Sequence, residues 1–247
     1  MGLSKPVTGT WPASAAVFGA SGGIGAAFTR VLADRAVPVS AGSRGGDVPR
    51  HHLVAPFTFD LTDESSIAAA AARMADNPPE LVLVASGALT LDDGTPPEKS
   101  YKAMDAAAMA RALAVNTIGP ALIAKHILPL MPRDRRFVFA VLSARVGSIS
   151  DNRLGGWHSY RASKAALNML VKNWAIELGR THKLGAIVAL HPGTVETRLS
   201  APFQQGLPPG QLRMRRDAAQ ALVDVVMQVG PDQSGMLIGW DGEVIAP

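Results

Sequence analysis

The stretch Gly19-Ala20-Ser21-Gly22-Gly23-Ile24-Gly25 decides the fold of this 247-residue chain. It follows a short apolar run, Ala15–Phe18, and opens a segment with helical spacing, Gly23–Ala33. Glycines let a backbone approach a diphosphate closely, and a helix amino terminus offers free N–H groups and a positive dipole end. A plain structural turn is the alternative. The order strand, glycines, helix is what a dinucleotide-binding turn requires, so we predict one here.

Short apolar runs alternate with longer helical segments along the rest of the chain. The runs are almost continuously apolar, as expected for strands that are covered on both faces of a parallel sheet. The alternation predicts right-handed crossovers and an α/β fold, a Rossmann-type doubly wound parallel sheet of about seven strands with helices on both faces. The expected strands are Ala15–Phe18, Val37–Ala41, Leu53–Phe59, Leu81–Ala85, Phe137–Leu142, Ala186–Leu190 and Met236–Ile238, and the expected helices are Gly23–Ala33, Glu64–Met74, Ala106–Leu130, Tyr160–Leu178 and Asp217–Val229.

No linker rich in Pro, Gly or Ser divides the chain, so we predict a single domain over residues 1–247 with residues 1–14 as an N-terminal extension. The segment 198–216 is rich in Pro, Gly and Gln and is too long for an ordinary connection. We expect it to be a lid over the substrate.

Composition excludes several classes of protein. With 47% hydrophobic and 18% charged residues the chain can bury a core, and the absence of cysteine excludes disulfides and thiolate metal sites. A net charge of +4 is compatible with an anionic ligand, but scattered basic residues and few aromatics argue against nucleic acid. No stretch approaches the ~20 apolar residues that span a bilayer, and no signal peptide is evident. We expect a cytoplasmic protein without a metal or a membrane partner.

The run Tyr160-Arg161-Ala162-Ser163-Lys164 carries the strongest chemical signal. On a helix, a spacing of four places the phenol and the ammonium on one face, a turn apart. A fixed cation favours the phenolate and brings a phenol of pKa ~10 toward acid–base chemistry. The alternative is a surface aromatic residue beside a solvated lysine.

The glycine spacing Gly19-x-x-x-Gly23-x-Gly25, taken with the Tyr-x-x-x-Lys run, resembles the short-chain dehydrogenase/reductase family over nearly the whole chain. Longer strings are similar to its C-factor-like branch, which is related to carbonyl reductases: Ser143–Asn152, Gly155-Gly156-Trp157 and the tail Ser234–Ile245. The resemblance implies a nicotinamide-dependent oxidoreductase with a small-molecule substrate. Family members commonly pair the two long helices, here Ala106–Leu130 and Tyr160–Leu178, across a two-fold axis, which implies a homodimer or a homotetramer.

The resemblance also implies roles for single residues. Asp60 is expected to bond the adenine amino group, and Asn116 to bend its helix and hold a water that links Lys164 to solvent. The turn Pro192–Thr197 is expected to cap the nicotinamide, with the Val195 backbone at the carboxamide. The implied cofactor-binding residues are Gly19, Ser21, Gly22, Gly23, Ile24, Gly25, Ser43, Arg44, Asp60, Leu61, Ser86, Gly87, Tyr160, Lys164, Pro192, Gly193, Val195 and Thr197.

Two departures from the family pattern concern the site. Where the family commonly has Asn-Asn-Ala-Gly after its fourth strand, this chain has Val84-Ala85-Ser86-Gly87. The serine that holds the substrate carbonyl normally lies three residues before a glycine, and here Ala144 occupies that place before Gly147. Ser143 or Ser148 must supply the hydroxyl, or none does, and Ser143 is preferred.

The loop after the second strand points to the cofactor type. An NAD-type fold usually has an acidic residue ~20 positions after the glycine loop. Here Ala41-Gly42-Ser43-Arg44 has no acid before Asp47, and Arg44 lies 19 residues after Gly25. A guanidinium can bind a 2′-phosphate through charge-assisted hydrogen bonds, with the Ser43 hydroxyl as a second donor. We predict a preference for NADP(H), with NAD(H) possible; a solvent-facing arginine is the alternative.

The leading hypothesis is interconversion of a carbonyl compound and an alcohol, with Tyr160, Lys164 and Asn116 as a proton relay and Ser143 at the carbonyl oxygen. The rival is a nicotinamide-nucleotide sensor or signalling factor on the same scaffold, which Ala144 and the missing asparagines favour. Pure binding needs no proton relay, so the relay residues favour the enzyme. The substrate cannot be read from the sequence, but Asn152–His158 and Arg198–Arg216 are expected to line its pocket.

Overall fold

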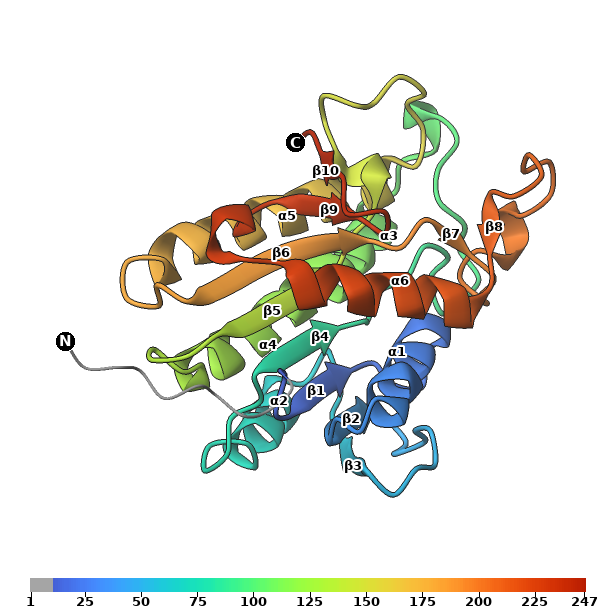
Figure 1. Ribbon diagram of the computed structural model, residues 1–247. Helices are drawn as coiled ribbons and strands as arrows, with labels where there is room; N and C mark the ends of the chain where they lie inside the picture. Colours follow the sequence, from blue (N-terminus) through green and yellow to red (C-terminus); the bar gives the residue numbers. More distant parts are fainter. Residues whose placement is uncertain (1–10) are drawn as a thin grey trace.

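The computed structural model describes residues 11–247 and contains a central sheet with helices on both faces (Figure 1). The eight strands lie in the order β10-β9-β6-β5-β4-β1-β2-β3, and every neighbouring pair is parallel except β9 and β10. The predicted doubly wound sheet is confirmed. The strands are β1 (Ala15–Phe18), β2 (Val39–Ser43), β3 (Val54–Thr58), β4 (Leu81–Val84), β5 (Phe137–Leu142), β6 (Gly185–His191), β9 (Leu237–Gly239) and β10 (Val244–Ile245).

The strand count differs from the expectation, as do the bounds of five strands by one or two residues, namely those of β2, β3, β4, β6 and β9. The additional strand is the antiparallel edge strand β10, which is too short to show a period in the sequence. β2 begins at Val39 rather than Val37, because Val37 donates its amide to Leu32 O (3.0 Å) and so belongs to the turn that ends the first helix. β3 ends at Thr58, one residue short of Phe59.

The helices form one layer on each face of the sheet (Figure 1). α1 (Gly23–Asp34) and α6 (Arg215–Gln228) pack together on one face, and α2 (Glu64–Ala72), α4 (Gly119–Ile127) and α5 (His158–Leu178) cover the other. Alternate residues of β5 enter the two hydrophobic cores that result. Burial on both faces explains why the strands are apolar without interruption.

The long helix expected over Ala106–Leu130 is divided in the structure. α3 (Ala106–Leu113) passes into a π-helical turn at Ala114–Ile118, and α4 follows before a 3₁₀ turn at Leu128–Leu130. Asn116 lies in the π-helical turn and is fully buried, so the irregular turn falls where the sequence suggested a bend.

Residues 106–130 are long and apolar enough, by length and composition, to cross a membrane, which the sequence reading did not anticipate. Ile123, Ala124 and Ile127 on the α4 part are fully buried in the core against the sheet. A helix of this kind is common in the core of a globular domain.

The segment 198–216, predicted to be a lid, is partly ordered by pairing. It contains a 3₁₀ turn at Ala201–Phe203 and the strand β8 (Leu212–Arg213), which lies parallel to β7 (Thr194–Val195). The Ser200 hydroxyl ties its first part to Val195 O (2.5 Å). Its action as a lid stays a prediction, and of the predicted N-terminal extension, residues 1–10 lie outside the described residues.

Candidate active site

The candidate residues gather where the parallel strands end. Gly19 directly follows β1, Ser43 ends β2, Ser86 lies just after β4, Ser143 follows β5 and Pro192 follows β6. β1 lies between β2 and β4, so the sheet is wound in opposite directions from this point. Ligands of doubly wound sheets bind at such a switch point, outside the carboxyl ends of the strands.

The glycine loop is packed so tightly that it has no room for side chains at Gly19 and Gly25, which leaves its backbone open to close approach by a ligand. Gly19 has φ +92°, and a Cβ there would lie 2.8 Å from Ser86 Oγ; a Cβ on Gly25 would lie 2.2 Å from Gly19 O. The first α1 amide that bonds back along the helix is that of Ala26, to Gly22 O (2.8 Å). The amides before it, at the positive end of the helix dipole, are left for an anion, which fits a diphosphate.

The turn after β6 lies against this loop. A Cβ on Gly23 would come within 2.6 Å of Thr197 Cγ2, and Gly193 adopts φ +76° beside the Trp240 indole. Val195 is buried in β7. The structure therefore brings the predicted nicotinamide turn and the predicted diphosphate loop together.

The residues predicted to hold the adenosine end gather at the ends of β2 and β3. The Ser43 hydroxyl is buried and has no hydrogen-bond partner within residues 11–247, while the following residue, Arg44, is exposed. Hydrogen bonds from the backbone and side chain of Thr62 hold the pKa of Asp60 below its ordinary value, and the Arg44 charge acts in the same direction. An orphaned hydroxyl beside a cation fits a 2′-phosphate.

Asp60 and Leu61 are placed by local contacts. Asp60 Oδ1 accepts from the Thr62 amide (2.8 Å) and hydroxyl (2.7 Å), whereas the cap of α2 is Asp63. Leu61 packs against the start of α4, where a Cβ on Gly119 would lie 2.2 Å from Leu61 Cγ. Asp60 is thus free of the helix-capping role that a lone aspartate often has.

Tyr160 and Lys164 occupy successive turns of α5 and are both buried, with 8% and 3% of their surface exposed. The Lys164 ammonium donates to Leu142 O (2.9 Å) at the end of β5 and lies 5.9 Å from the Tyr160 ring centre. The pair therefore has the arrangement that its spacing predicted, but in the interior rather than on a solvated surface.

Burial sets the protonation states of the pair. It raises the pKa of Tyr160 to about 12 and lowers the pKa of Lys164 to about 8, because the charged form of each group loses water. We expected the lysine to favour the phenolate; burial outweighs that effect here. The phenol is a protonated donor at neutral pH, beside an amine that still carries its charge.

Asn116 links the π-helical turn to Ala88 in the segment after β4 and to Ser163, the residue before Lys164 on α5. Its side chain accepts from the Ala88 amide (2.9 Å) and donates to Ala88 O (2.8 Å) and Ser163 Oγ (3.1 Å). A Cβ on Gly87 would lie 3.1 Å from Asn116 Oδ1 and 3.4 Å from Lys164 Nζ. Gly87 thus lets the segment after β4 approach Asn116 and Lys164, and the water-holding role of Asn116 stays a prediction.

Ser143 and Ser148, the two candidates for the hydroxyl at the substrate carbonyl, both make hydrogen bonds to other residues of the protein. Ser143 Oγ donates to Asn168 Oδ1 (2.7 Å), and Asn168 lies eight residues beyond Tyr160, about 12 Å along the helix axis. Ser148 Oγ accepts from the Asp151 amide (3.0 Å). A role at the substrate carbonyl stays a prediction for Ser143.

An apolar cavity of about 410 Å³ adjoins Tyr160. Of the two segments expected to line it, Arg198–Arg216 contributes Phe203, whose ring contacts Trp157 (5.0 Å between centres). The expectation for Asn152–His158 was wrong, because no residue of that segment lines this cavity. Most of the wall comes instead from the segment after β4 and from α3, which the sequence analysis missed because no motif marks them. These wall residues include Ala88, Leu89, Leu91, Pro96, Pro97, Glu98, Ala108 and Ala112.

Comparisons with known proteins agree with this geometry. The short chain dehydrogenase family model matches residues 13–207. A 1-hydroxy-2-glutathionyl-2-methyl-3-butene dehydrogenase from Rhodococcus sp. (strain AD45) is 30% identical, with 92% of this chain and 96% of the relative covered. C-signal from Myxococcus xanthus is 32% identical over 56% of this chain and 78% of its own.

Among solved structures, the NADPH-bound carbonyl reductase from chicken fatty liver superposes with a TM-score of 0.77 at 25% identity, covering 95% of this chain and 99% of the other. The likeness to C-signal and to a carbonyl reductase confirms the branch that the sequence indicated. With its glycine loop, its Tyr160–Lys164 pair and a family match over most of its length, the chain is a member of the short-chain dehydrogenase/reductase family.

Proposed function

We propose that this oxidoreductase interconverts a carbonyl compound and an alcohol and uses NADP(H) in preference to NAD(H). The observation that carries the proposal is the buried Tyr160–Lys164 pair at the sheet edge that also holds the glycine loop, with Tyr160 in the wall of an apolar cavity. The NADPH-bound carbonyl reductase among its structural relatives supports the same reaction. A reducing cytoplasm suits a chain without cysteine.

NADPH, when bound, supplies the hydride that the carbonyl carbon receives. Tyr160 donates its phenol proton to the carbonyl oxygen as negative charge develops there. Lys164, one turn away, stabilises the phenolate that results and would bind the cofactor ribose, and a water held at Asn116 would pass a proton from solvent toward Lys164. Ser143 is the candidate for a second contact to the carbonyl oxygen, which requires its hydroxyl to leave Asn168.

The preference for NADP(H) rests on Arg44 and Ser43. We expect Arg44→Ala to weaken NADPH binding by about 1.5–3 kcal/mol, the usual cost of a lost charged hydrogen bond, and to change NADH binding little. Fluorescence titration of the nucleotides measures both. Arg50→Ala, which removes another exposed arginine from the same loop, is the control and should leave both affinities unchanged. Equal weakening of both nucleotides, or a wild type that prefers NADH, would show that Arg44 does not read the 2′-phosphate.

The cavity favours carbonyl compounds with an apolar substituent, because its wall is built mainly from Ala, Leu and Pro side chains. The experiment is a panel of aldehydes and ketones incubated with NADPH, with loss of its absorbance as the readout. Apolar members of the panel should turn over and anionic ones should not.

The second candidate is a nucleotide-binding signalling factor with little turnover. Two observations favour it: Ala144 replaces the expected serine and the Ser143 hydroxyl is already bound by Asn168. The resemblance to C-signal points the same way. NADPH binding without turnover of any carbonyl compound would establish it.

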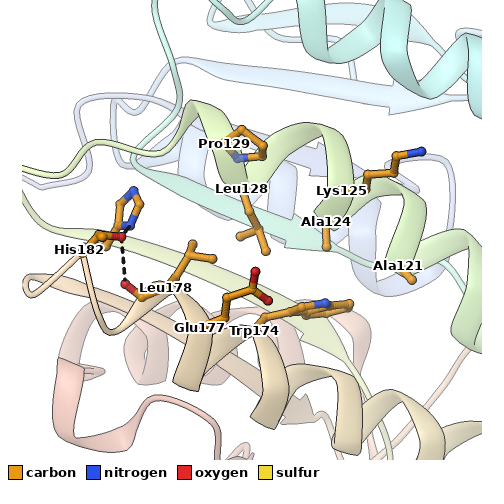
Figure 2. A pocket seen from close by; sticks show the side chains of 10 residues that line it. Ala121, Ala124, Lys125, Leu128, Pro129, Trp174, Glu177, Leu178 and His182 are labelled. Atoms are coloured by element: carbon orange, nitrogen blue, oxygen red, sulfur yellow. Dashed lines mark hydrogen bonds between the residues drawn. The ribbon is translucent and has the colours of Figure 1, made fainter.

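We further propose a homodimer or homotetramer formed through α4 and α5. Figure 2 shows side chains of these two helices around a shared groove of about 380 Å³. Apolar Leu128, Trp174 and Leu178 line this groove, together with the charged Lys125 and Glu177. Packing of this face against a second copy would cover it.

Light scattering should therefore give a mass of two or four times 25.8 kDa at micromolar concentration. Ala121→Arg, which places a charge in the groove, should shift the population toward monomer, whereas Ala72→Arg on the exposed side of α2 should not. A wild type that is entirely monomeric would contradict the assembly.

A further inference from the structure

A buried carboxylate outside the proposed relay holds the beginning of the catalytic helix. Glu98 lies in the connection between β4 and α3, has 9% of its surface exposed and is part of the cavity wall. Its Oε2 accepts from the Ser159 amide (3.1 Å), and its Oε1 accepts from the Ser159 hydroxyl. Its backbone carbonyl accepts from the Trp157 amide (2.5 Å). Three donors at the start of α5 thus converge on one residue from a distant part of the chain.

The start of α5 needs an acceptor from elsewhere. Trp157 is the residue that precedes the helix, and its side chain has no group that caps the first amides. Gly155, Gly156 and Trp157 have φ of +61°, +66° and +50°, so the chain enters the helix through three successive left-handed residues. Glu98 supplies the missing acceptor and a negative charge at the positive end of the helix dipole.

Hydrogen bonding keeps this carboxylate ionised. Burial alone would raise the pKa of Glu98, but the hydrogen bonds from Ser159 and from its own backbone amide, together with the effect of His158, outweigh it and hold the pKa below its ordinary value. A buried charge that is hydrogen-bonded through both oxygens fixes geometry, because moving it would leave donors and acceptors unpaired.

The contact reaches the phenol through one residue. Ser159 directly precedes Tyr160, and the Trp157 ring packs edge-on against the Tyr160 ring (6.3 Å between centres). The first turn of α5 carries the phenol and the Glu98 contact, and the residue just before it, Trp157, carries the ring that meets Phe203 of segment 198–216. Loosening the contact would displace the phenol relative to the cavity.

We propose that Glu98 is a positioning residue, which fixes the first turn of α5 through Ser159 and so sets the place of the Tyr160 phenol beside the substrate cavity. The inference rests on the proposed function, since it assigns Tyr160 the role of proton donor.

The test compares four variants of the full-length protein. Glu98→Ala should lower turnover of a carbonyl substrate by about 10- to 100-fold, the scale of a misplaced reacting group, with NADPH affinity changed less than about two-fold. Glu98→Gln should restore most of the turnover, because its amide oxygen can accept from the Ser159 amide while its N–H donates to the hydroxyl. Ser159→Ala removes the hydroxyl that Glu98 binds and should also lower turnover. The double variant should lose little more turnover than Glu98→Ala alone, because both substitutions break the same contact.

Asp63→Ala is the matched control. Asp63 also holds the start of a helix, because it accepts from the amide (2.9 Å) and the hydroxyl (2.7 Å) of Ser65 in α2, but it lies outside the cavity wall. Equal turnover losses in Asp63→Ala and Glu98→Ala would overturn the proposal, as would additive effects of the Glu98 and Ser159 changes. A loss that appears only as a raised KM for one substrate would make Glu98 a substrate contact instead.

Hydrogen exchange separates this proposal from the proposed function. Glu98→Ala should speed exchange of the amides in the first turn of α5 and leave the first turn of α3 unchanged. If the wild type turns over no carbonyl compound and these amides still respond, the proposed function is wrong and the placement of α5 by Glu98 is right. If exchange does not respond, the placement is wrong.

Discussion

Tyr160→Phe is expected to lower turnover by about 10²–10⁴-fold, the contribution typical of a general acid, while NADPH affinity stays nearly unchanged. The substitution removes one hydroxyl and keeps the ring that packs against Trp157. Burial raises the pKa of Tyr160 to about 12, so the wild-type phenol carries its proton at every pH near neutrality and is ready to donate it. Without the hydroxyl, the developing alkoxide loses its direct proton donor, and Lys164 would have to act from one turn further along α5.

The chain contains a matched control for this prediction. Tyr101 is the other of its two tyrosines and has 68% of its surface exposed, so Tyr101→Phe should leave turnover and binding unchanged. Turnover measured with NADPH on an active carbonyl compound, together with nucleotide titration, gives both quantities. If Tyr160→Phe retains full activity on every active substrate, the proposed mechanism is wrong and the sensor hypothesis should replace it.

Much of the site could be predicted because its chemistry is encoded in local spacing. The glycine loop needs only a strand before it and a helix after it, and the Tyr160–Lys164 spacing acts within one helix. Ser43 at the end of β2 and Pro192 just after β6 could also be placed, because the carboxyl ends of parallel strands lie at the same edge of the sheet. Local patterns of this kind survive in the sequence because neighbouring residues determine them.

What could not be predicted depends on contacts between distant segments. The Glu98 carboxylate reaches Ser159 across 61 residues, and Ser143 reaches Asn168 across 25. Neither pair has a spacing that marks it. The pKa of Tyr160 is raised, not lowered as expected, because the ring is buried by packing against other segments. The four-residue spacing to Lys164 gives no sign of that burial. The two-residue strand β10 exists only because β9 provides an edge to pair with.

Lys164→Ala is expected to damage both turnover and cofactor binding. The ammonium is assigned to the phenolate and to the cofactor ribose, so turnover should fall by about 10²–10⁴-fold and NADPH should bind with about 1.5–3 kcal/mol less affinity. Because the pKa of Lys164 is lowered to about 8, its charge is present below that pH and lost above it. Wild-type turnover should accordingly fall as pH rises through about 8, and the variant should lack this step.

Lys172→Ala is the control, since Lys172 lies two turns further along α5 and is exposed. Thermal melting must accompany the assay, because Lys164→Ala also removes the donor to Leu142 O, and an unpaired buried carbonyl costs about 1–3 kcal/mol of stability. A folded variant that loses turnover but binds NADPH normally would show that Lys164 acts on the Tyr160 phenol and does not bind the cofactor ribose. A folded variant that keeps both would exclude the relay, because no other cation lies one turn from Tyr160 on the same face of α5 within the described chain.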